Sequence, residues 1–334
     1  MRKKFVFGPV ASRRLGRSLG VDPIPHKTCN LNCVYCQLGR SQPVVNERKS
    51  YFPPEEIVAE TLDAIRQYKG KIDWISFVGS GEPTLHSDIG KIIREVQSSV
   101  DLPVCVITNG ALLYRPEVRS DLLVADAVLP SLDAGSPELY RRINRPHHSF
   151  NFNNNNDFDR LIRGAIEFRR EYKGALWVET MLIRGMNDTE SALRDIAEKL
   201  EQIRPDQSHI LLPIRSPSET WALPSNDEGV MRARAIFGSV CKVIYPHSVD
   251  FDLNGFDNLA DAVSRIVSRH PIEQTELERA LARCLPVGSD LSREMEKLQA
   301  DSRVRLIERH GVRFWTGTSS DYPATGEFEK ISEK

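Results

Sequence analysis

Hydrophobic positions follow two different spacings along most of the chain, from about residue 54 to residue 245. Apolar runs of about four to eight residues, such as 73–78, are typical of buried parallel strands. The stretches between them place apolar residues three or four positions apart, as in amphipathic helices. The predicted strands cover 18–24, 73–78, 104–107, 127–129, 176–183, 208–212 and 241–245. The first predicted helix starts at residue 54. The other predicted helices cover 89–96, 118–123, 158–171, 190–203 and 227–237.

This strand–helix alternation predicts an α/β fold with a parallel sheet inside and helices outside. About six βα units can be counted, so we expect a partial (β/α)6 barrel, similar to a TIM barrel, rather than the full eight-unit form. The asparagine-rich stretch 151–156 predicts a surface loop.

The pattern changes near residue 269. Two amphipathic helices, 274–284 and 290–300, precede two short apolar strands around Arg309-His310-Gly311, which is a hairpin signal. This order predicts a small winged helix-turn-helix-like module. The expected organisation is a barrel over 1–250, a connecting helix or linker over 251–268, the module over 269–318 and a flexible tail over 319–334.

The composition is that of an ordinary globular protein. Of 334 residues, 40% are hydrophobic and 27% are charged, which excludes a disordered chain. No apolar run approaches the roughly 20 residues of a membrane helix, and no secretory signal follows the basic start. We therefore expect a cytoplasmic protein without a membrane partner. The net charge of −1 gives no general argument for nucleic-acid binding.

Three of the six cysteines, Cys29, Cys33 and Cys36, lie close together in the chain. In a chain of this length, such spacing predicts a metal or catalytic centre rather than a disulfide framework. Three thiolates can hold a four-iron cluster and leave one iron open for a substrate or cofactor. For this segment alone, a zinc site with His26 as the fourth ligand is the alternative.

The Cys-x3-Cys-x-aromatic-Cys spacing, with Tyr35 as the aromatic residue, resembles the signature of the radical S-adenosylmethionine (radical SAM) superfamily. The segment Gly79-Ser80-Gly81-Glu82-Pro83 resembles the glycine-rich segment of that superfamily, whose backbone meets the amino group of the cofactor's methionine moiety. Ser80 departs from the family, which more often has glycine there. Glycines at a strand end also let a backbone approach a ligand closely. The resemblance implies a [4Fe-4S] cluster on the three cysteines and S-adenosyl-L-methionine as cofactors.

Further polar residues follow the predicted strands. By the same resemblance, Asn109 would lie near the nucleoside, and Ser131 and Asp133 near the ribose or the methionine carboxylate. The alternative is that these residues only cap turns and helices. Glu179 and Met181 either face the barrel interior or pack in the core.

Two segments, 7–20 and 131–146, are similar to a largely uncharacterised branch of the superfamily that is related to the wyosine-forming tRNA enzymes. Those enzymes carry additional N-terminal cysteines, whereas no cysteine precedes Cys29 here. A second cluster and wyosine synthesis are therefore not expected. The remaining cysteines are isolated, as packing residues usually are; they are Cys105, Cys241 and Cys284.

The resemblance implies reductive cleavage of S-adenosylmethionine and hydrogen abstraction from an unidentified substrate by the resulting radical. An RNA base and a peptide or protein side chain are the leading substrates, and flavodoxin or ferredoxin would donate the electron. Six basic residues precede the first acidic one, Asp22, and such clustering can bind phosphate groups, including those of RNA. The alternative is a solvated face or arginines that pair with carboxylates of the core.

The competing interpretation is a non-catalytic zinc- or cluster-containing regulator that binds nucleic acid or protein through the winged-helix-like tail. The charge of the tail does not favour DNA, because Arg269 to Thr318 contains nine basic and eight acidic residues, a net of +1. The glycine-rich segment favours the enzyme, since a regulator has no need for a cofactor-sized barrel.

Overall fold

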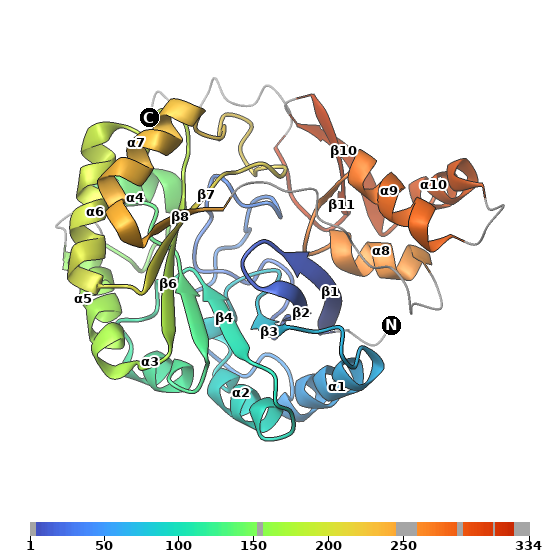
Figure 1. The fold of residues 1–334 in the computed structure, drawn as a ribbon, viewed down its shortest axis with the longest axis horizontal. Helices are drawn as coiled ribbons and strands as arrows, with labels where there is room; N and C mark the ends of the chain where they lie inside the picture. Colours follow the sequence, from blue (N-terminus) through green and yellow to red (C-terminus); the bar gives the residue numbers. More distant parts are fainter. Residues whose placement is uncertain (1–4, 152–155, 245–258, 286–289, 310, 324–334) are drawn as a thin grey trace.

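The computed structural model describes residues 5–151, 156–244, 259–285, 290–309 and 311–323, and an eight-stranded sheet forms its centre (Figure 1). The strands lie in the sheet in chain order, from β1 to β8. The first two form an antiparallel hairpin, and all later neighbours are parallel. The strands are β1 Val6–Ser12, β2 Gly16–Val21, β3 Trp74–Phe77, β4 Val104–Thr108, β5 Ala127–Pro130, β6 Ala175–Met181, β7 Gln207–Leu211 and β8 Cys241–Val243.

Helices connect the parallel strands and cover the outside of the sheet (Figure 1). They are α1 Pro54–Gln67, α2 Ile89–Gln97, α3 Pro116–Leu122, α4 Pro137–Asn144, α5 Asn156–Glu171, α6 Glu190–Ile203 and α7 Asp227–Phe237. The predicted six βα units run from β2–α1 to β7–α7. Within the described residues, the edge strands β1 and β8 are not paired with each other, so the barrel is partial, as predicted.

The parallel strands end at a common rim. In the register, Val21 lies opposite Phe77, and Thr108 lies opposite Pro130. Because the carboxyl ends of parallel strands share one edge, the residues that follow each strand meet there. Four of the predicted site segments, which begin after β2, β3, β4 and β5, therefore lie side by side.

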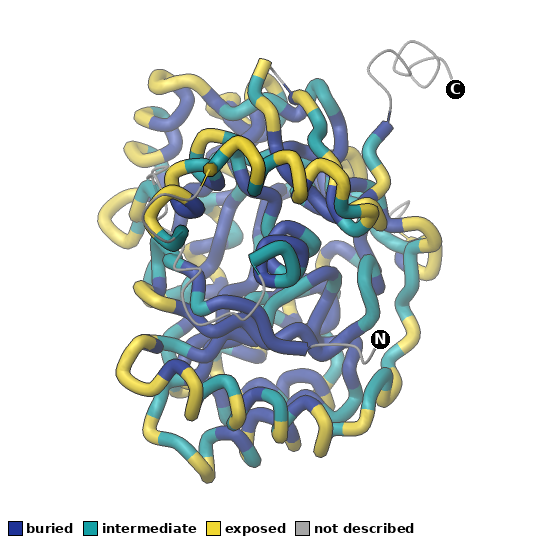
Figure 2. Tube along the Cα trace, turned by 90° about the vertical axis from the view of Figure 1, so that its right-hand side faces the viewer, coloured by how far each residue is buried: buried dark blue, intermediate teal, exposed yellow. Residues whose placement is uncertain are grey.

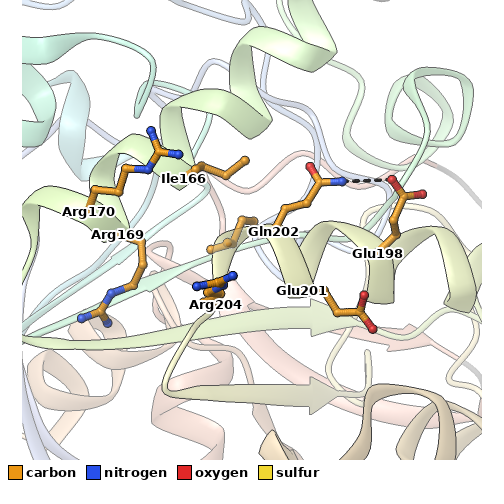
Figure 3. Close-up of a pocket in the computed structure, with 8 residues that line it drawn as sticks. Ile166, Arg169, Arg170, Glu198, Glu201, Gln202 and Arg204 are labelled. Atoms are coloured by element: carbon orange, nitrogen blue, oxygen red, sulfur yellow. Dashed lines mark hydrogen bonds between the residues drawn. The ribbon is translucent and has the colours of Figure 1, made fainter.

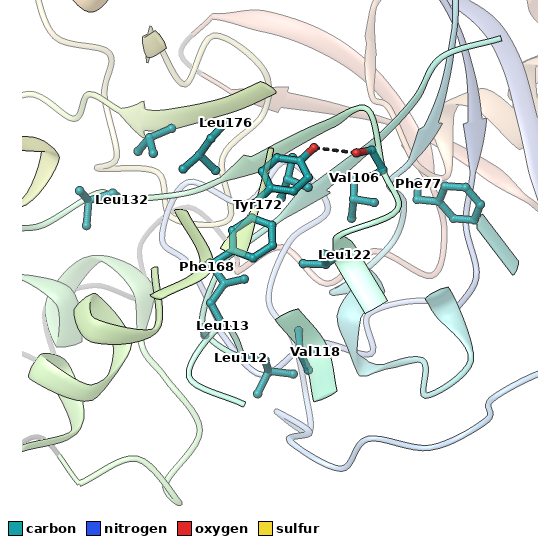
Figure 4. Close-up of a cluster of buried hydrophobic side chains, with 14 of the residues drawn as sticks. Phe77, Val106, Leu112, Leu113, Val118, Leu122, Leu132, Phe168, Tyr172 and Leu176 are labelled. Carbon is teal, nitrogen blue, oxygen red and sulfur yellow. Dashed lines mark hydrogen bonds between the residues drawn. The ribbon is translucent and has the colours of Figure 1, made fainter. Parts of the chain in front are cut away.

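The main hydrophobic core fills the space between the sheet and the outer helices. Figure 2 shows the buried chain concentrated inside and the exposed residues on the outer faces of the helices. Phe168 of α5 stacks on Tyr172, with ring centroids 4.7 Å apart (Figure 4). The Tyr172 hydroxyl donates a hydrogen bond of 2.8 Å to the carbonyl of Ala125, which lies just before β5. This contact fixes the end of α5 to the sheet.

The C-terminal part lies beside β1 (Figure 1). Its elements are α8 Leu259–Val267, β9 Ile272–Glu273, α9 Gln274–Cys284, α10 Leu291–Gln299, β10 Val304–Arg309 and β11 Val312–Gly317, and its three strands form one sheet in the order β10-β11-β9. The two predicted helices and the hairpin are present, whereas the winged-helix assignment and the domain boundaries stay predictions. A second hydrophobic cluster joins Ile266 and Trp315 to Phe7 and Val10 of β1.

Some predictions fall wholly or partly outside the described residues. They concern the asparagine-rich loop 151–156, the linker 251–268, the tail after residue 323 and the basic residues Arg2, Lys3 and Lys4. Within the described ranges, no helix is long and apolar enough to cross a membrane.

A Tyr172→Phe exchange should lower the free energy of unfolding by about 1–3 kcal/mol, because it leaves the buried Ala125 carbonyl without its donor. Urea denaturation followed by circular dichroism measures this loss. Tyr51→Phe is the control, since that hydroxyl binds the Glu47 carbonyl at the surface and its loss should cost less than about 0.5 kcal/mol. Equal losses in the two variants would contradict the assignment.

Candidate active site

The three cysteines lie in the loop that connects β2 to α1. The backbone N–H of Cys36 donates to the carbonyl of Cys33 at 3.1 Å, which closes a turn between them. Burial raises the pKa of Cys29 to about 12 and the pKa of Cys33 well above its ordinary value. The neighbouring Cys36 contributes to both shifts, so the three thiols lie within electrostatic range of one another.

Each cysteine sulfur has a nitrogen donor, two from distant parts of the chain and one from the cysteine loop itself. The contacts are Asn109 Nδ2 to Cys29 Sγ at 3.7 Å, Asn144 Nδ2 to Cys33 Sγ at 3.5 Å and Lys27 Nζ to Cys36 Sγ at 3.3 Å. Such donors stabilise negative charge on sulfur, which cluster ligands carry. The sequence did not single out Lys27 or Asn144. Lys27 lies within the cysteine loop and could have been considered there, whereas Asn144 lies 111 residues from Cys33 and gave no local signal.

The glycine-rich segment packs directly against the cysteine loop. A Cβ atom on Gly79 would lie 2.2 Å from the Asp22 carboxyl, and one on Gly81 would lie 2.0 Å from the Thr28 carbonyl oxygen. No side chain fits at such distances, so both positions require glycine. Ser80, which stands where the family more often has glycine, donates its hydroxyl to Asp22 Oδ2 at 2.7 Å.

The buried carboxylate of Glu82 links the ends of two strands by hydrogen bonds. Its carboxylate accepts hydrogen bonds of 2.6–3.0 Å from the backbone and hydroxyl of Thr84, the hydroxyl of Thr108 and the backbone N–H of Asn109. Burial raises the pKa of Glu82, and these hydrogen bonds oppose the rise. Pro83 begins the short 3₁₀ helix η1 (Pro83–Leu85), which continues the turn. The carboxylate thus ties the end of β3 to the end of β4.

One cavity of about 340 Å³ opens between the cysteine loop, the strand ends and the β1–β2 hairpin. Its size is within the range of small-molecule pockets. The predicted residues that line it are Cys33, Tyr35, Cys36, Gly79, Ser131, Asp133, Glu179 and Met181. The predicted residues outside this lining are Cys29, Ser80, Gly81, Glu82, Pro83 and Asn109. Asn109 lines a separate small pocket beside α5, which Ser131 also borders.

Asp133 organises one wall of the cavity. Its Oδ2 accepts the Tyr35 hydroxyl at 2.5 Å and Asn144 Nδ2 at 2.7 Å, and its Oδ1 accepts the backbone N–H of Met181 at 2.9 Å. Burial raises the pKa of Asp133, and burial beside Asp133 raises the pKa of Tyr35 well above its ordinary value. Tyr35 thereby joins the cysteine loop to the ends of β5 and β6.

The structure does not favour the zinc alternative. Burial, together with the charges of Lys27 and Arg269, lowers the pKa of His26 to about 4, and Asp22 opposes this shift. Among the described residues, no three His, Cys, Asp or Glu side chains are grouped to hold a single metal ion.

A second pocket, of about 510 Å³, lies on the outer surface between α5 and α6 (Figure 3). Arg169 and Arg170 of α5 and Arg204, which follows α6, border it, and Gln202 donates to Glu198 at 2.9 Å. None of the predicted site residues lines this pocket. Its charged side chains belong to outer helix faces, so it is not the candidate active site.

Comparison with known proteins identifies the family. A sequence profile of the Radical SAM superfamily matches residues 24–203, more than half of the chain, and this range includes the cysteine triplet and the glycine-rich segment. The chain belongs to the radical SAM superfamily. The resemblance that the spacing of Cys29, Cys33 and Cys36 predicted is confirmed.

The chain is similar to two further proteins in sequence and to one solved structure in fold. It is 44% identical over 243 residues to a protein named GTPase Obg from Brachyspira hyodysenteriae, and the match covers 73% of this chain and 35% of that protein. It is 35% identical over 283 residues to a UPF0026 protein of Methanocaldococcus jannaschii, covering 82% and 85% of the two chains. The crystal structure of a radical SAM methyltransferase from Sphaerobacter thermophilus has a TM-score of 0.52 at 16% identity, covering 68% and 65%, and shares the fold.

Replacing Gly81 by Ala should reduce the iron that the protein retains after anaerobic reconstitution. The new Cβ would lie 2.0 Å from the Thr28 carbonyl oxygen, so the cysteine loop or the strand end must move, at a cost of about 1–3 kcal/mol in unfolding free energy. Iron and sulfide content and chemical denaturation measure both effects.

Gly185→Ala is the control for this variant. No atom lies within 4 Å of its added Cβ, so only the positive φ of 68° costs stability, about 1 kcal/mol, and iron should be retained. Normal iron content in Gly81→Ala would show that the close approach is not required.

Proposed function

We propose that this protein is a radical SAM enzyme in which Cys29, Cys33 and Cys36 hold a [4Fe-4S] cluster next to a site for S-adenosylmethionine. The observation that carries the proposal is the close packing of the cysteine loop on the segment Gly79 to Pro83 at the rim of the cavity. The donor set supports it, because three thiols come from one loop and each sulfur has a nitrogen donor.

When bound, the reduced cluster and its cofactor would supply the electron transfer and the 5′-deoxyadenosyl radical that takes a hydrogen atom from the substrate. The chain itself provides position and environment. The backbone of Gly79 is open to the cavity and suits an amino group, and Ser131 and Asp133 present polar groups in the same wall. Asn109 links the end of β4 to the cysteine loop, since its Nδ2 donates to Asn30 Oδ1 at 2.7 Å.

Apolar side chains make up much of the remaining wall, among them Val78, Ile107, Leu211 and Leu212. These side chains exclude water and other hydrogen donors, both of which would cause side reactions of the radical. An electron-transfer protein such as flavodoxin or ferredoxin would reduce the cluster. The substrate would be an RNA base or a side chain of a peptide or protein.

Anaerobic reconstitution with iron and sulfide tests the proposal. We expect about four irons per chain, the EPR signal of a reduced cluster, and 5′-deoxyadenosine when S-adenosylmethionine and dithionite are added. One tightly bound zinc ion and no 5′-deoxyadenosine would refute it.

Replacing Cys33 by Ala should abolish 5′-deoxyadenosine formation and the EPR signal, because a thiolate ligand is lost. Cys284→Ala is the matched control, since this cysteine lies at the end of α9, outside the cavity lining, and should retain both signals. Reductive cleavage by the Cys33→Ala protein would disprove the assignment of the triplet.

A further inference from the structure

Arginines from three separate parts of the chain line the same cavity as Cys33 and Cys36. Arg13 and Arg14 lie in the turn between β1 and β2, Arg215 follows β7, and Arg269 follows α8. The carboxylates in this lining are those of Asp133 and Glu179. The cavity wall thus carries four guanidinium groups and two carboxylates.

Two of these arginines are neutralised by carboxylates. Arg14 forms an ion pair with the buried Glu179, and Arg269 Nε lies 2.8 Å from Asp22 Oδ2. The Arg14 charge, together with His209, outweighs burial and lowers the pKa of Glu179. These two arginines therefore have structural partners that account for their positions.

Arg13 and Arg215 differ from them. The Nη1 atom of Arg13 is buried and has no hydrogen-bond partner among the described residues. Arg215 donates from Nη1 to Gln37 Oε1 at 3.3 Å, and this partner is neutral. Gln37 directly follows Cys36, which places this guanidinium beside the cysteine loop. A buried donor without a partner is costly, and a ligand oxygen would satisfy it.

The arginines are close enough to repel one another. Burial, Arg13 and Arg14 lower the pKa of Arg215 to about 9, and burial and Arg14 lower the pKa of Arg13. Glu276 of α9 opposes both shifts, and Glu179 also opposes the shift of Arg13. Burial and these arginines hold the pKa of His270 well below its ordinary value, so the imidazole adds no positive charge near neutral pH.

Other basic residues near the start of the chain are explained by ion pairs. The pairs are Arg17 with Asp73 at 2.7 Å, Arg40 with Glu219 at 3.0 Å, and Arg48 with Asp121. Pairing with carboxylates, the alternative raised by the sequence, therefore accounts for these residues and for Arg14, but not for Arg13.

We propose that Arg13 and Arg215 bind a phosphate group of the substrate, in the cavity that also holds Cys33 and Cys36. Guanidinium forks bind phosphate through paired hydrogen bonds, and a phosphate dianion matches two such groups better than one carboxylate does. The volume of this cavity, about 340 Å³, is within the range of small-molecule pockets. The substrate class is therefore a nucleotide, either free or within RNA. This assignment of a substrate rests on the proposed function, whereas the anion site can be tested without it.

Calorimetric titration of the full-length, reconstituted protein with inorganic pyrophosphate tests the site. We expect wild-type protein to bind pyrophosphate, and Arg13→Gln and Arg215→Gln each to bind it about tenfold more weakly. Arg215→Lys should be intermediate, because lysine keeps the charge and loses the fork. Arg17→Gln is the matched control, since Arg17 lies in the same hairpin but pairs with Asp73 at the surface, and it should bind normally.

Thermal unfolding separates loss of binding from loss of folding. Pyrophosphate should raise the Tm of the wild type, and the Arg13→Gln and Arg215→Gln proteins should melt no lower than the wild type because one like charge is removed. The proposal is overturned if the wild type does not bind pyrophosphate, if both glutamine variants bind it equally well, or if succinate binds as tightly as pyrophosphate.

Two further ligands distinguish the sources of the phosphate. Displacement of pyrophosphate by AMP, with no gain from a ten-nucleotide RNA, supports a free nucleotide. Binding of the RNA about tenfold more tightly than AMP supports a nucleic acid. Failure of both to displace pyrophosphate would overturn the nucleotide class. Pyrophosphate binding without 5′-deoxyadenosine formation would refute only the proposed function, and the reverse result would refute only the anion site.

Discussion

The contact between the cysteine loop and the end of β3 is the constraint on which the rest of the site depends. Two backbones approach there so closely that Gly79 and Gly81 have no space for a Cβ atom. The Ser80 carbonyl accepts the Lys27 backbone N–H at 2.6 Å, and Glu82 N–H donates to the Thr28 carbonyl at 3.0 Å. Any displacement of the loop would break these bonds together, so the positions of the thiols follow from the position of the strand end.

Much of the barrel could be predicted from the sequence because strands such as β3, β4 and β5 are short, mainly apolar runs separated by amphipathic helices. The hairpin strand β1 was missed because Gly8 and Pro9 interrupt its pattern and its register shifts between Phe7 and Val10. Helix α4 was not predicted, although Ser136 caps it and Pro137 opens it. Local signals were therefore present for α4 and obscured for β1.

The site was predictable where chemistry depends on local spacing and not where it depends on contacts distant in sequence. The cysteine triplet and the glycines lie within short segments, so their pattern is visible in the chain. Two of the three sulfur partners are not, because Asn109 lies 80 residues from Cys29 and Asn144 lies 111 residues from Cys33. Charge has the same limitation: basic clustering near the start was visible, but only the fold separates Arg17, which is paired with Asp73, from Arg13.

Gln37 connects the cysteine loop to Arg215 and Arg269 in the wall of the cavity. It follows Cys36, accepts the Arg215 guanidinium through its side-chain oxygen, and donates its side-chain N–H to the Arg269 carbonyl at 3.2 Å. Its own carbonyl accepts the Tyr322 hydroxyl at 2.5 Å, which ties the cysteine loop to the C-terminal part. Its hydrogen bonds thus join the cysteine loop to Arg215, Arg269 and Tyr322. In the proposed anion site, an oxyanion that drew Arg215 away from Gln37 would therefore free the Gln37 side-chain acceptor, one residue after Cys36.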